Sequence, residues 1–257
     1  MNPYLSVIIP CYNEQKNLER GVLEEVYGYL AAQDYRWELI VVNDQSTDDS
    51  RSLIADFAGD KPEISLVDIL HGGKPAAVWA GIRAARGEIV LFTDMDQSTP
   101  LEELEKLLPW YGRGCDVVIG SRGLEREGFS PFRRLGSVVF RSLRRACLLR
   151  EISDTQCGFK SCRREAALAV FPRLEFFKQS DRPHGWKVSA YDVELLHLWN
   201  KAGYELKEVE VRWLNRDESD TKDQTGAVGR YLRESIEMMR EVLRVRLNEF
   251  KGLYDTP

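Results

Sequence analysis

Short apolar runs alternate with longer amphipathic stretches over the first half of the chain. Each run is rich in β-branched and aromatic residues and ends in polar or glycine-rich residues, which is typical of strands covered on both faces. The runs are residues 5–9, 37–42, 64–69, 88–93 and 116–120. Between them, helical patterns reach to about Gln33, to about Phe57, through Arg86 and over Leu101–Trp110. This alternation predicts a mostly parallel, doubly wound α/β sheet flanked by helices, with ligands beyond the carboxyl ends of its strands.

The second half of the chain is less regular. Tyr204–Trp213 alternates like a half-buried strand, and Gly226–Gly252 has the apolar spacing of a helix that packs on the protein or faces a membrane. Residues 131–150 combine arginines and apolar residues without an acid, so a basic amphipathic helix is predicted there. It suits an anionic membrane surface, or it is a solvated helix paired with acids elsewhere. We divide the chain into a main domain, residues 1–222, and a C-terminal helical extension, residues 223–257.

Length and composition narrow the class of protein. With 257 residues, the chain can bury a sizeable core. No apolar run approaches the ~18 residues of a membrane-spanning helix, and the amino terminus has no signal-peptide pattern, so secretion is not expected. The five cysteines share no metal-binding spacing, as expected for reduced thiols in the cytosol. A formal net charge of −5 argues against a nucleic-acid binder.

Two carboxylates follow the fourth apolar run directly, in the sequence Asp94-Met95-Asp96. If strand geometry continues through these residues, alternation aims both carboxylates to one side. Such a pair favours a hard divalent ion, Mg²⁺ or Mn²⁺, which in turn gathers phosphate oxygens. The alternative is a surface turn in which an Asp caps the helix that begins near Pro100.

Four segments taken together resemble the inverting glycosyltransferases of family 2, which have the GT-A nucleotide-sugar-binding fold. The segments are VIIPCYNE, VVNDQSTDDS, GGK followed by AGIRAARGEIV, and FTDMDQSTP, in this order within residues 5–100. The segments DTQCGFK and YDVELL, with Ser121-Arg122, are similar to the branch that transfers a sugar to a polyprenyl phosphate, such as dolichyl-phosphate glucosyl- and mannosyltransferases. The resemblance implies a Rossmann-like GT-A fold and covers about residues 4–220.

The resemblance implies a donor site in the first half of the chain. Pro10, Tyr12, Glu14 and Asp44 would cradle the base and ribose, and Lys74 would neutralise the diphosphate. The chemistry agrees, because Tyr12 offers a stacking face and a carboxylate accepts hydrogen bonds from sugar hydroxyls.

By the same resemblance, Asp94 and Asp96 are the acidic motif, with Asp96 the principal metal ligand. The common mannosyltransferase pattern has a Gln two places after the second Asp. Here that place holds Ser98, and the Gln is at position 97, so a third protein ligand is not predicted.

An acceptor site is implied in the second half. Arg122 and one of Arg133 and Arg134 resemble the pair that holds the acceptor phosphate, a role that suits the bidentate fork of arginine. In DTQCGFK and YDVELL, four residues match family positions near the sugar: Asp154, Gln156, Asp192 and Glu194. Capping or structural hydrogen bonds are the alternative role for them.

The proposed acceptor removes the need for a general base. None of the three histidines is a convincing base by spacing. A phosphate monoester has its second pKa near ~6, so at neutral pH it is already the dianionic nucleophile. The resemblance therefore predicts inverting transfer of a hexose to a polyprenyl phosphate, with UDP-glucose the favoured donor and GDP-mannose the next. We expect peripheral attachment at the cytoplasmic face of the membrane and make no prediction of oligomeric state.

Two other functions remain open from the sequence. One is a family 2 transferase that acts on a hydroxyl acceptor in polysaccharide or glycoconjugate synthesis, for which Asp192, Glu194 or Asp154 would be the base. The other is a non-catalytic nucleotide-sugar-binding module. A dinucleotide dehydrogenase is disfavoured, because no G-x-G-x-x-G follows the first apolar run.

Overall fold

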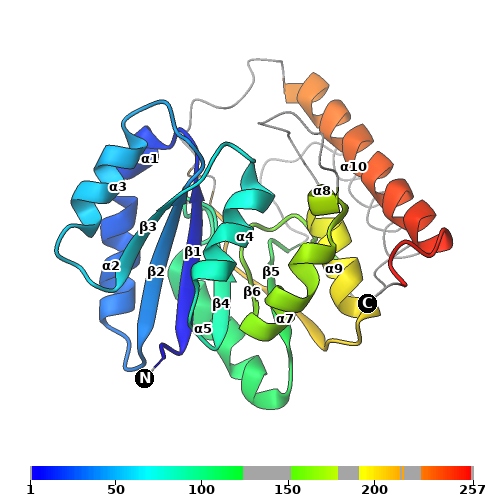
Figure 1. The fold of residues 1–257 in the computed structure, drawn as a ribbon, viewed down its shortest axis with the longest axis horizontal. Helices are drawn as coiled ribbons and strands as arrows, with labels where there is room; N and C mark the ends of the chain where they lie inside the picture. Colours follow the sequence, from blue (N-terminus) through cyan, green and yellow to red (C-terminus); the bar gives the residue numbers. More distant parts are fainter. Residues whose placement is uncertain (1, 124–151, 179–190, 215, 217–226, 256–257) are drawn as a thin grey trace.

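The computed structural model describes residues 2–123, 152–178, 191–214, 216 and 227–255. Within these ranges the chain forms one seven-stranded sheet with helices on both faces (Figure 1). The strands are β1 (Leu5–Cys11), β2 (Trp37–Asn43), β3 (Ile64–Asp68), β4 (Ile89–Phe92), β5 (Val117–Ser121), β6 (Lys160–Arg163) and β7 (Leu206–Glu210). The predicted α/β fold, a mostly parallel sheet flanked by helices, is confirmed.

The sheet order is β3-β2-β1-β4-β6-β5-β7. β1 pairs in parallel with both β2 and β4, and β5 pairs in parallel with β7. β6 is antiparallel to both of its neighbours, β4 and β5. The apolar pattern predicts no strand at residues 160–163, so β6 is a difference from the predicted sheet. The carboxyl ends of the other six strands still share one edge.

Two of the predicted helical stretches are divided into shorter helices. The helical segments are α1 (Gln15–Glu19), α2 (Val22–Ala31), α3 (Ser50–Ala58), α4 (Lys74–Ala84), η1 (Leu101–Glu103), α5 (Leu104–Leu107), η2 (Leu108–Arg113), α7 (Arg164–Val170), η3 (Phe171–Arg173), α8 (Glu175–Lys178), α9 (Tyr191–Lys201) and α10 (Ala227–Phe250). The stretch to Gln33 breaks at Gly21, which has a φ of 86°. The stretch from Leu101 is largely 3₁₀ turns, and Pro109 lies within it.

Alternate residues of each buried strand face opposite helical layers. In β1, Ile8 belongs to one apolar cluster, whereas Val7 and Ile9 belong to the other. The Ile8 side packs under α4, α7, α9 and α10, and the Val7 side packs under α1, α2, α3 and α5. These two layers hold the strand ends, and therefore the loops that follow them, in fixed positions.

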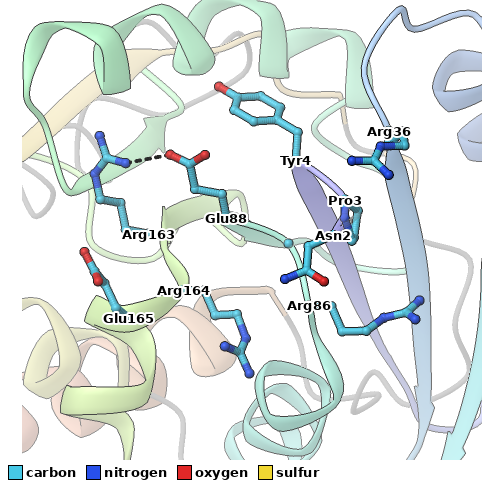
Figure 2. A pocket seen from close by; sticks show the side chains of 10 residues that line it. Asn2, Pro3, Tyr4, Arg36, Arg86, Glu88, Arg163, Arg164 and Glu165 are labelled. Carbon is cyan, nitrogen blue, oxygen red and sulfur yellow. Dashed lines mark hydrogen bonds and ion pairs between the residues drawn. The ribbon is translucent and has the colours of Figure 1, made fainter.

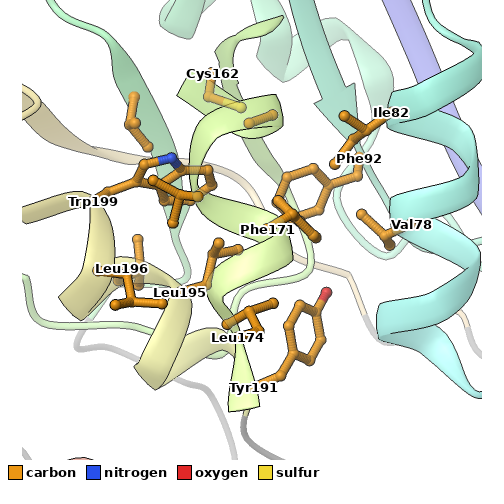
Figure 3. Packing of buried hydrophobic residues seen from close by; sticks show 14 of the residues in the cluster. Val78, Ile82, Phe92, Cys162, Phe171, Leu174, Tyr191, Leu195, Leu196 and Trp199 are labelled. Carbon is orange, nitrogen blue, oxygen red and sulfur yellow. The ribbon is translucent and has the colours of Figure 1, made fainter. Parts of the chain in front are cut away.

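Aromatic side chains join η3 and α9 to β4, the strand that precedes the acidic loop (Figure 3). Phe171 packs edge-on against Phe92 of β4, with ring centroids 6.0 Å apart, and against Trp199 of α9 at 6.2 Å. The indole of Trp199 donates to the carbonyl oxygen of Ala166 at 3.0 Å, so its polar atom is satisfied although it is fully buried.

Several expectations lie outside the described residues. They are the basic helix at 131–150, with Arg133 and Arg134, and the boundary between residues 222 and 223. The C-terminal helix is present as α10, and Val242 and Val245 pack into the same cluster as α9. Searching the described helices for a span long and apolar enough to cross a bilayer finds none.

Candidate active site

The described residues among those predicted for the donor and acceptor sites gather at the carboxyl edge of the sheet. Tyr12 and Glu14 follow β1, Asp44 follows β2, and Lys74 begins α4 after β3. The acidic pair follows β4, and Arg122 follows β5. Because these strands run in one direction, their following loops meet along one side of the molecule.

Asp44 fixes the glycine-rich loop that leads to Lys74. Its carboxylate accepts hydrogen bonds from the backbone N–H groups of Gly72 and Gly73, at 2.8 and 2.9 Å. It also lies 3.0 Å from Nδ1 of His71. The side chain is buried, so in this structure its acceptor capacity serves the loop. The role predicted for Asp44 at the ribose stays a prediction.

Tyr12 and His71 form a stacked pair, with ring centroids 4.4 Å apart and an angle of 26° between the planes. The pairing joins the loop after β1 to the loop after β3. The sequence does not predict this contact, because nothing in it shows that residues 59 positions apart would meet. Pro10 lies half-buried in β1 opposite Val42, and Glu14 accepts a hydrogen bond from Asn17 at 2.6 Å.

Lys74 and Asp94 form an ion pair between Nζ and Oδ1. Partial burial would lower the pKa of Lys74, but the charges of Asp94, Asp192 and Asp96 outweigh it and raise the pKa. Burial would likewise raise the pKa of Asp94, but the charges of neighbouring cations outweigh it and lower the pKa. These cations are Lys74, Lys160 and Arg122. Both groups therefore stay charged at neutral pH.

The acidic loop is held from several sides. Oδ1 of Asp96 accepts a hydrogen bond from the backbone N–H of Ser98 at 2.8 Å, and its carbonyl oxygen accepts one from Arg20 at 2.8 Å. Gln97 has a φ of 47° and donates its amide to the carbonyl oxygen of Asp94 at 2.7 Å. Over the described residues, no group of three or more His, Cys, Asp or Glu side chains forms a metal site.

Arg122 and Asp154 form a bidentate pair. Nε and Nη2 of Arg122 donate to the two carboxylate oxygens of Asp154, at 2.7 and 2.8 Å. Asp154 is positioned in turn by Glu208, which accepts the backbone N–H of Asp154 at 2.6 Å. The pair uses one edge of the guanidinium, and within the described residues no hydrogen bond of its Nη1 group is found. Gln156, two residues on, is exposed.

Lys160 was missed by the sequence analysis, although it closes the DTQCGFK segment. Its side chain is 1% exposed, and its Nζ donates to the carbonyl oxygen of Cys157 and lies 2.9 Å from Oδ1 of Asp192. Asp192 is in the first turn of α9. Gly158, in the same segment, approaches Asp94 so closely that a Cβ would lie 1.9 Å from its Oδ2 atom.

Glu194, two residues after Asp192, has a different role. Its carboxylate is buried and bonds to Arg244 and Tyr254, both at 2.9 Å, and to the backbone N–H of Glu175 at 3.1 Å. These bonds connect α9 to Arg244 of α10 and to Tyr254, which follows α10. The structure therefore contradicts the suggestion that Glu194 could serve as a base at the site.

A cavity of about 670 Å³ opens at the opposite, amino-terminal edge of the sheet (Figure 2). Its polar lining includes Arg86, Glu88, Arg163 and Arg164. Arg163 pairs with Glu88 at 2.9 Å. None of the predicted site residues lines this cavity, so it is not part of the candidate active site.

Comparison with known sequences gives one consistent result. Residues 6–171 match the profile of a family described as Glycosyl transferase family 2. A dolichyl-phosphate beta-glucosyltransferase of Trichomonas vaginalis is 33% identical over 235 residues, covering 85% of this chain and 66% of the relative. The Homo sapiens protein of the same description is 33% identical over 229 residues, covering 81% and 67%. The chain spans about two thirds of the length of these relatives.

Solved structures share the fold. A mannosyltransferase from Pyrobaculum calidifontis, in complex with GDP-Man and Mn²⁺, superposes with a TM-score of 0.62 at 21% identity, covering 95% of this chain and 65% of that one. Glucosyl-3-phosphoglycerate synthase from Mycobacterium tuberculosis, with Mn²⁺, UDP and glucosyl-3-phosphoglycerate, gives 0.61 at 19% identity, covering 95% and 80%. At this level of identity, the likeness concerns the fold alone.

Proposed function

Since the chain belongs to glycosyl transferase family 2 and is a glycosyltransferase, we propose that it transfers a hexose with inversion from a nucleotide sugar to a polyprenyl phosphate. UDP-glucose is the favoured donor and GDP-mannose the next. The relatives named dolichyl-phosphate beta-glucosyltransferase support both the lipid acceptor and the glucosyl donor. A lipid acceptor in turn requires peripheral contact with the membrane, for which we propose the cytoplasmic face.

The observation that carries the proposal is that every carboxylate suggested as a general base is already engaged by a cation. Asp154 pairs with Arg122, Asp192 with Lys160, and Glu194 with Arg244. A hydroxyl acceptor needs a carboxylate that is available to take its proton. A phosphate acceptor arrives already ionised, so it fits a site whose carboxylates are committed to ion pairs.

The donor set at the acidic loop fits a divalent metal. Asp94 and Asp96 provide oxygen ligands, and Mg²⁺ or Mn²⁺ typically completes its shell with substrate phosphates and water. Ser98, at the end of the loop, has a buried hydroxyl with no hydrogen-bond partner within the described structure. We propose that Asp94 and Asp96 hold the metal, with Asp96 its principal ligand. When bound, the ion would stabilise negative charge on the leaving diphosphate.

The chain's own residues would supply placement and charge. Tyr12, Pro10, Glu14 and Asp44 would form the base and ribose pocket, and Lys74 would lie at the diphosphate. Each of these residues would hold the donor in place, because a donor held in the reactive geometry needs little reorganisation before it reacts.

On the acceptor side, the Nη1 group of Arg122, which Asp154 does not use, would orient the attacking phosphate oxygen while Asp154 holds the guanidinium. Asp192 and Gln156 would lie near the transferred sugar. Attack on the anomeric carbon from the side opposite the diphosphate would invert its configuration, and the leaving diphosphate takes the bonding electrons.

The direct test is transfer of radiolabelled glucose from UDP-glucose, with Mn²⁺ or Mg²⁺ present, in reactions with and without polyprenyl phosphate. A lipid-linked β-glucoside that forms only with the phosphate acceptor is the expected result. Parallel reactions with GDP-mannose set the order of donors. Transfer to a sugar hydroxyl in place of the lipid would establish the other acceptor class, and binding without turnover on either acceptor would exclude both.

A further inference from the structure

The outer face of α10 exposes a row of large apolar side chains. Leu243, Leu247, Phe250 and Leu253 have exposed fractions of 51, 56, 78 and 48%. The three helical members are spaced by four and three residues, so they lie on one side of the helix. Figure 1 shows α10 on the outside of the molecule, at the end of the sequence. An apolar row of this kind on a surface marks a contact with another apolar phase.

The opposite face of α10, over its described side chains, packs inside the molecule. Val242 and Val245 are completely buried in the cluster shared with α9, and Asn248 is buried beside Glu175. The helix is therefore fixed to the protein by one side, and the apolar row faces away from that side. Packing within the described chain does not account for the row.

Cations flank the apolar row, and no described acid neutralises them. Arg240, Arg246 and Lys251 are exposed, and the described residues offer no acid within ion-pair distance of them. Arg246 lies over the ring of Phe250, at 5.0 Å from its centroid.

From residue 239 onward, where the side chains are described, the acids of α10 and the segment after it are paired with other cations. Glu241 pairs with Arg244, Glu249 with His197 and Lys201, and Asp255 with Lys201. The outward face is thus locally basic although the whole chain carries a formal charge of −5.

We propose that this face of α10 docks on an anionic lipid bilayer. Apolar side chains beside unpaired cations are the pattern of helices that lie in the interface plane, with the apolar row among the acyl chains and the cations at the lipid phosphates. A second copy of the chain is the less suitable occupant, because a two-fold contact would bring the same cations of both copies together. The proposal rests on the proposed function, since it identifies the surface that meets the lipid acceptor.

Docking through α10 would also bring the candidate active site close to the membrane surface. The inner face of α10 bonds to Glu194, and Glu194 lies in the first turn of α9, two residues from Asp192. The acceptor phosphate is a membrane headgroup, so a helix that rests on the bilayer would bring this turn of α9 toward the surface where that phosphate lies.

The test is sedimentation of the full chain with vesicles of phosphatidylcholine alone or mixed with phosphatidylglycerol, without any sugar donor. We expect binding to the anionic vesicles that is released by salt. The double variant Leu247→Glu with Phe250→Glu should lower partitioning by on the order of tenfold or more. Leu70→Glu is the matched control, because Leu70 is 72% exposed on the loop after β3 and should leave binding unchanged.

The cations are tested by the same assay. Arg246→Glu with Lys251→Glu should weaken binding to anionic vesicles, whereas Arg83→Glu, an exposed position on α4, should not. Circular dichroism melts establish that each variant is folded. Equal binding by the α10 variants and the parent protein would overturn the proposal. So would a concentration-dependent dimer, detected by sedimentation equilibrium, that Phe250→Glu abolishes.

Failure of docking is separable from failure of the proposed function. Transfer to a short-chain polyprenyl phosphate in detergent needs the active site but no bilayer, so the α10 variants should retain it. Retained transfer without vesicle binding by the parent protein would overturn docking alone. Vesicle binding by the parent without transfer to any phosphate acceptor would leave docking standing and remove the proposed function.

Discussion

Gly158 lies so close to Asp94 that its side chain must be a hydrogen atom. A methyl group in Gly158→Ala would come to 1.9 Å from Oδ2 of Asp94, so the carboxylate would have to move away from its pairing with Lys74. Because a displacement of about 1 Å in a reacting assembly can cost about 100-fold in rate, we expect kcat to fall by about that factor with the fold intact. The measurement is steady-state transfer of the sugar.

Gly28→Ala is the control for this substitution. Gly28 lies within α2, and nothing comes within 4 Å of a Cβ placed there. That variant should transfer at the parental rate and should be no less stable, because alanine favours helix. Normal turnover by Gly158→Ala would show that the position of Asp94 is unimportant.

Variants of the pair between Arg122 and Asp154 distinguish binding of the acceptor from binding of the donor. In Arg122→Ala the cation is lost, and in Asp154→Asn the guanidinium loses the carboxylate that orients it. Both variants should raise the KM for polyprenyl phosphate by on the order of tenfold, while the KM for the nucleotide sugar changes little. Initial rates with each substrate varied in turn provide the test. An equal rise in both KM values would place Arg122 outside the acceptor site.

Glu38 supplies a pH-dependent contribution to stability at the amino-terminal edge of the sheet. Burial would raise the pKa of its carboxyl, but hydrogen bonds from Ser6 and Arg86 and the charge of Arg86 outweigh burial and lower it. The stabilisation is therefore complete above the ordinary carboxyl pKa of about 4.3 and is lost as the pH falls through the lower pKa of the folded protein.

Accordingly, Glu38→Gln should cost about 2 kcal/mol in the free energy of unfolding at pH 7. The difference from the parent should shrink steadily below about pH 4, because the parent loses the same interactions there. Urea unfolding at a series of pH values provides the comparison. A difference that stays constant down to pH 3 would mean that the ionised form of Glu38 is not what stabilises the fold.

At the scale of elements, α9 and α10 are joined through a buried charge. Arg244 bonds to Glu194, Glu241 and Glu175, and Tyr254 also bonds to Glu194. Arg244→Met would leave the Glu194 carboxylate, which is almost fully buried, without its cation. Removing one partner of a buried pair typically costs about 3 kcal/mol, and we expect a loss of that size in chemical unfolding.

Arg246→Met is the control for Arg244→Met, because it makes the same chemical change two residues further along α10. Arg246 is exposed and has no acidic partner within the described structure, so its loss should change stability by less than about 0.5 kcal/mol. If Arg244→Met is as stable as Arg246→Met, the network does not hold the helix. A lower kcat in Arg244→Met, with unchanged binding of donor, would connect this network to the first turn of α9.

The elements that the sequence predicted correctly are those with a strong apolar period. These elements are the strands β1 to β5, the helices α3 and α4, and the C-terminal helix α10. The resemblance to family 2 glycosyltransferases is also confirmed. β6 was missed because Lys160 opens it and Arg163 ends it, which is not the pattern of a central strand. It can be central because Asp192 and a backbone carbonyl satisfy the buried ammonium of Lys160. That partner lies on a helix 32 residues later, so no local pattern contains the information.

The site shows the same limit. The order of motifs predicted which residues would meet at the carboxyl edge, because parallel strands bring their ends together. It did not predict that Asp44 would hold the backbone of Gly72 and Gly73, or that Tyr12 would stack on His71. These contacts depend on how each loop turns after its strand, which the strand pattern does not determine.

Across the whole molecule, three regions have different chemistry. The carboxyl edge of the sheet carries the alternating charges of Lys74, Asp94, Lys160, Asp192 and the Arg122 pair. The amino-terminal edge carries ion pairs whose role is stability. The outer face of α10 is apolar and basic. We therefore expect donor binding to change the stability of the molecule only through the carboxyl edge of the sheet.

Donor and metal should therefore stabilise the molecule together. A ligand that binds only the folded state adds about 2.7 kcal/mol at a hundred times its Kd, which for a chain of this size raises the melting temperature by about 5–10 °C. We expect UDP-glucose with Mn²⁺ to produce such a rise, and either component alone to produce much less, since the carboxylates of Asp94 and Asp96 repel the diphosphate unless a cation lies between them.

In Asp96→Ala the rise should become small and transfer should be abolished, while the melting temperature without ligand stays near that of the parent. Glu38→Gln, at the far edge, should melt lower without ligand yet gain the full increment with it. If Asp96→Ala retained both the increment and near-normal turnover, the metal would have to bind away from the loop after β4.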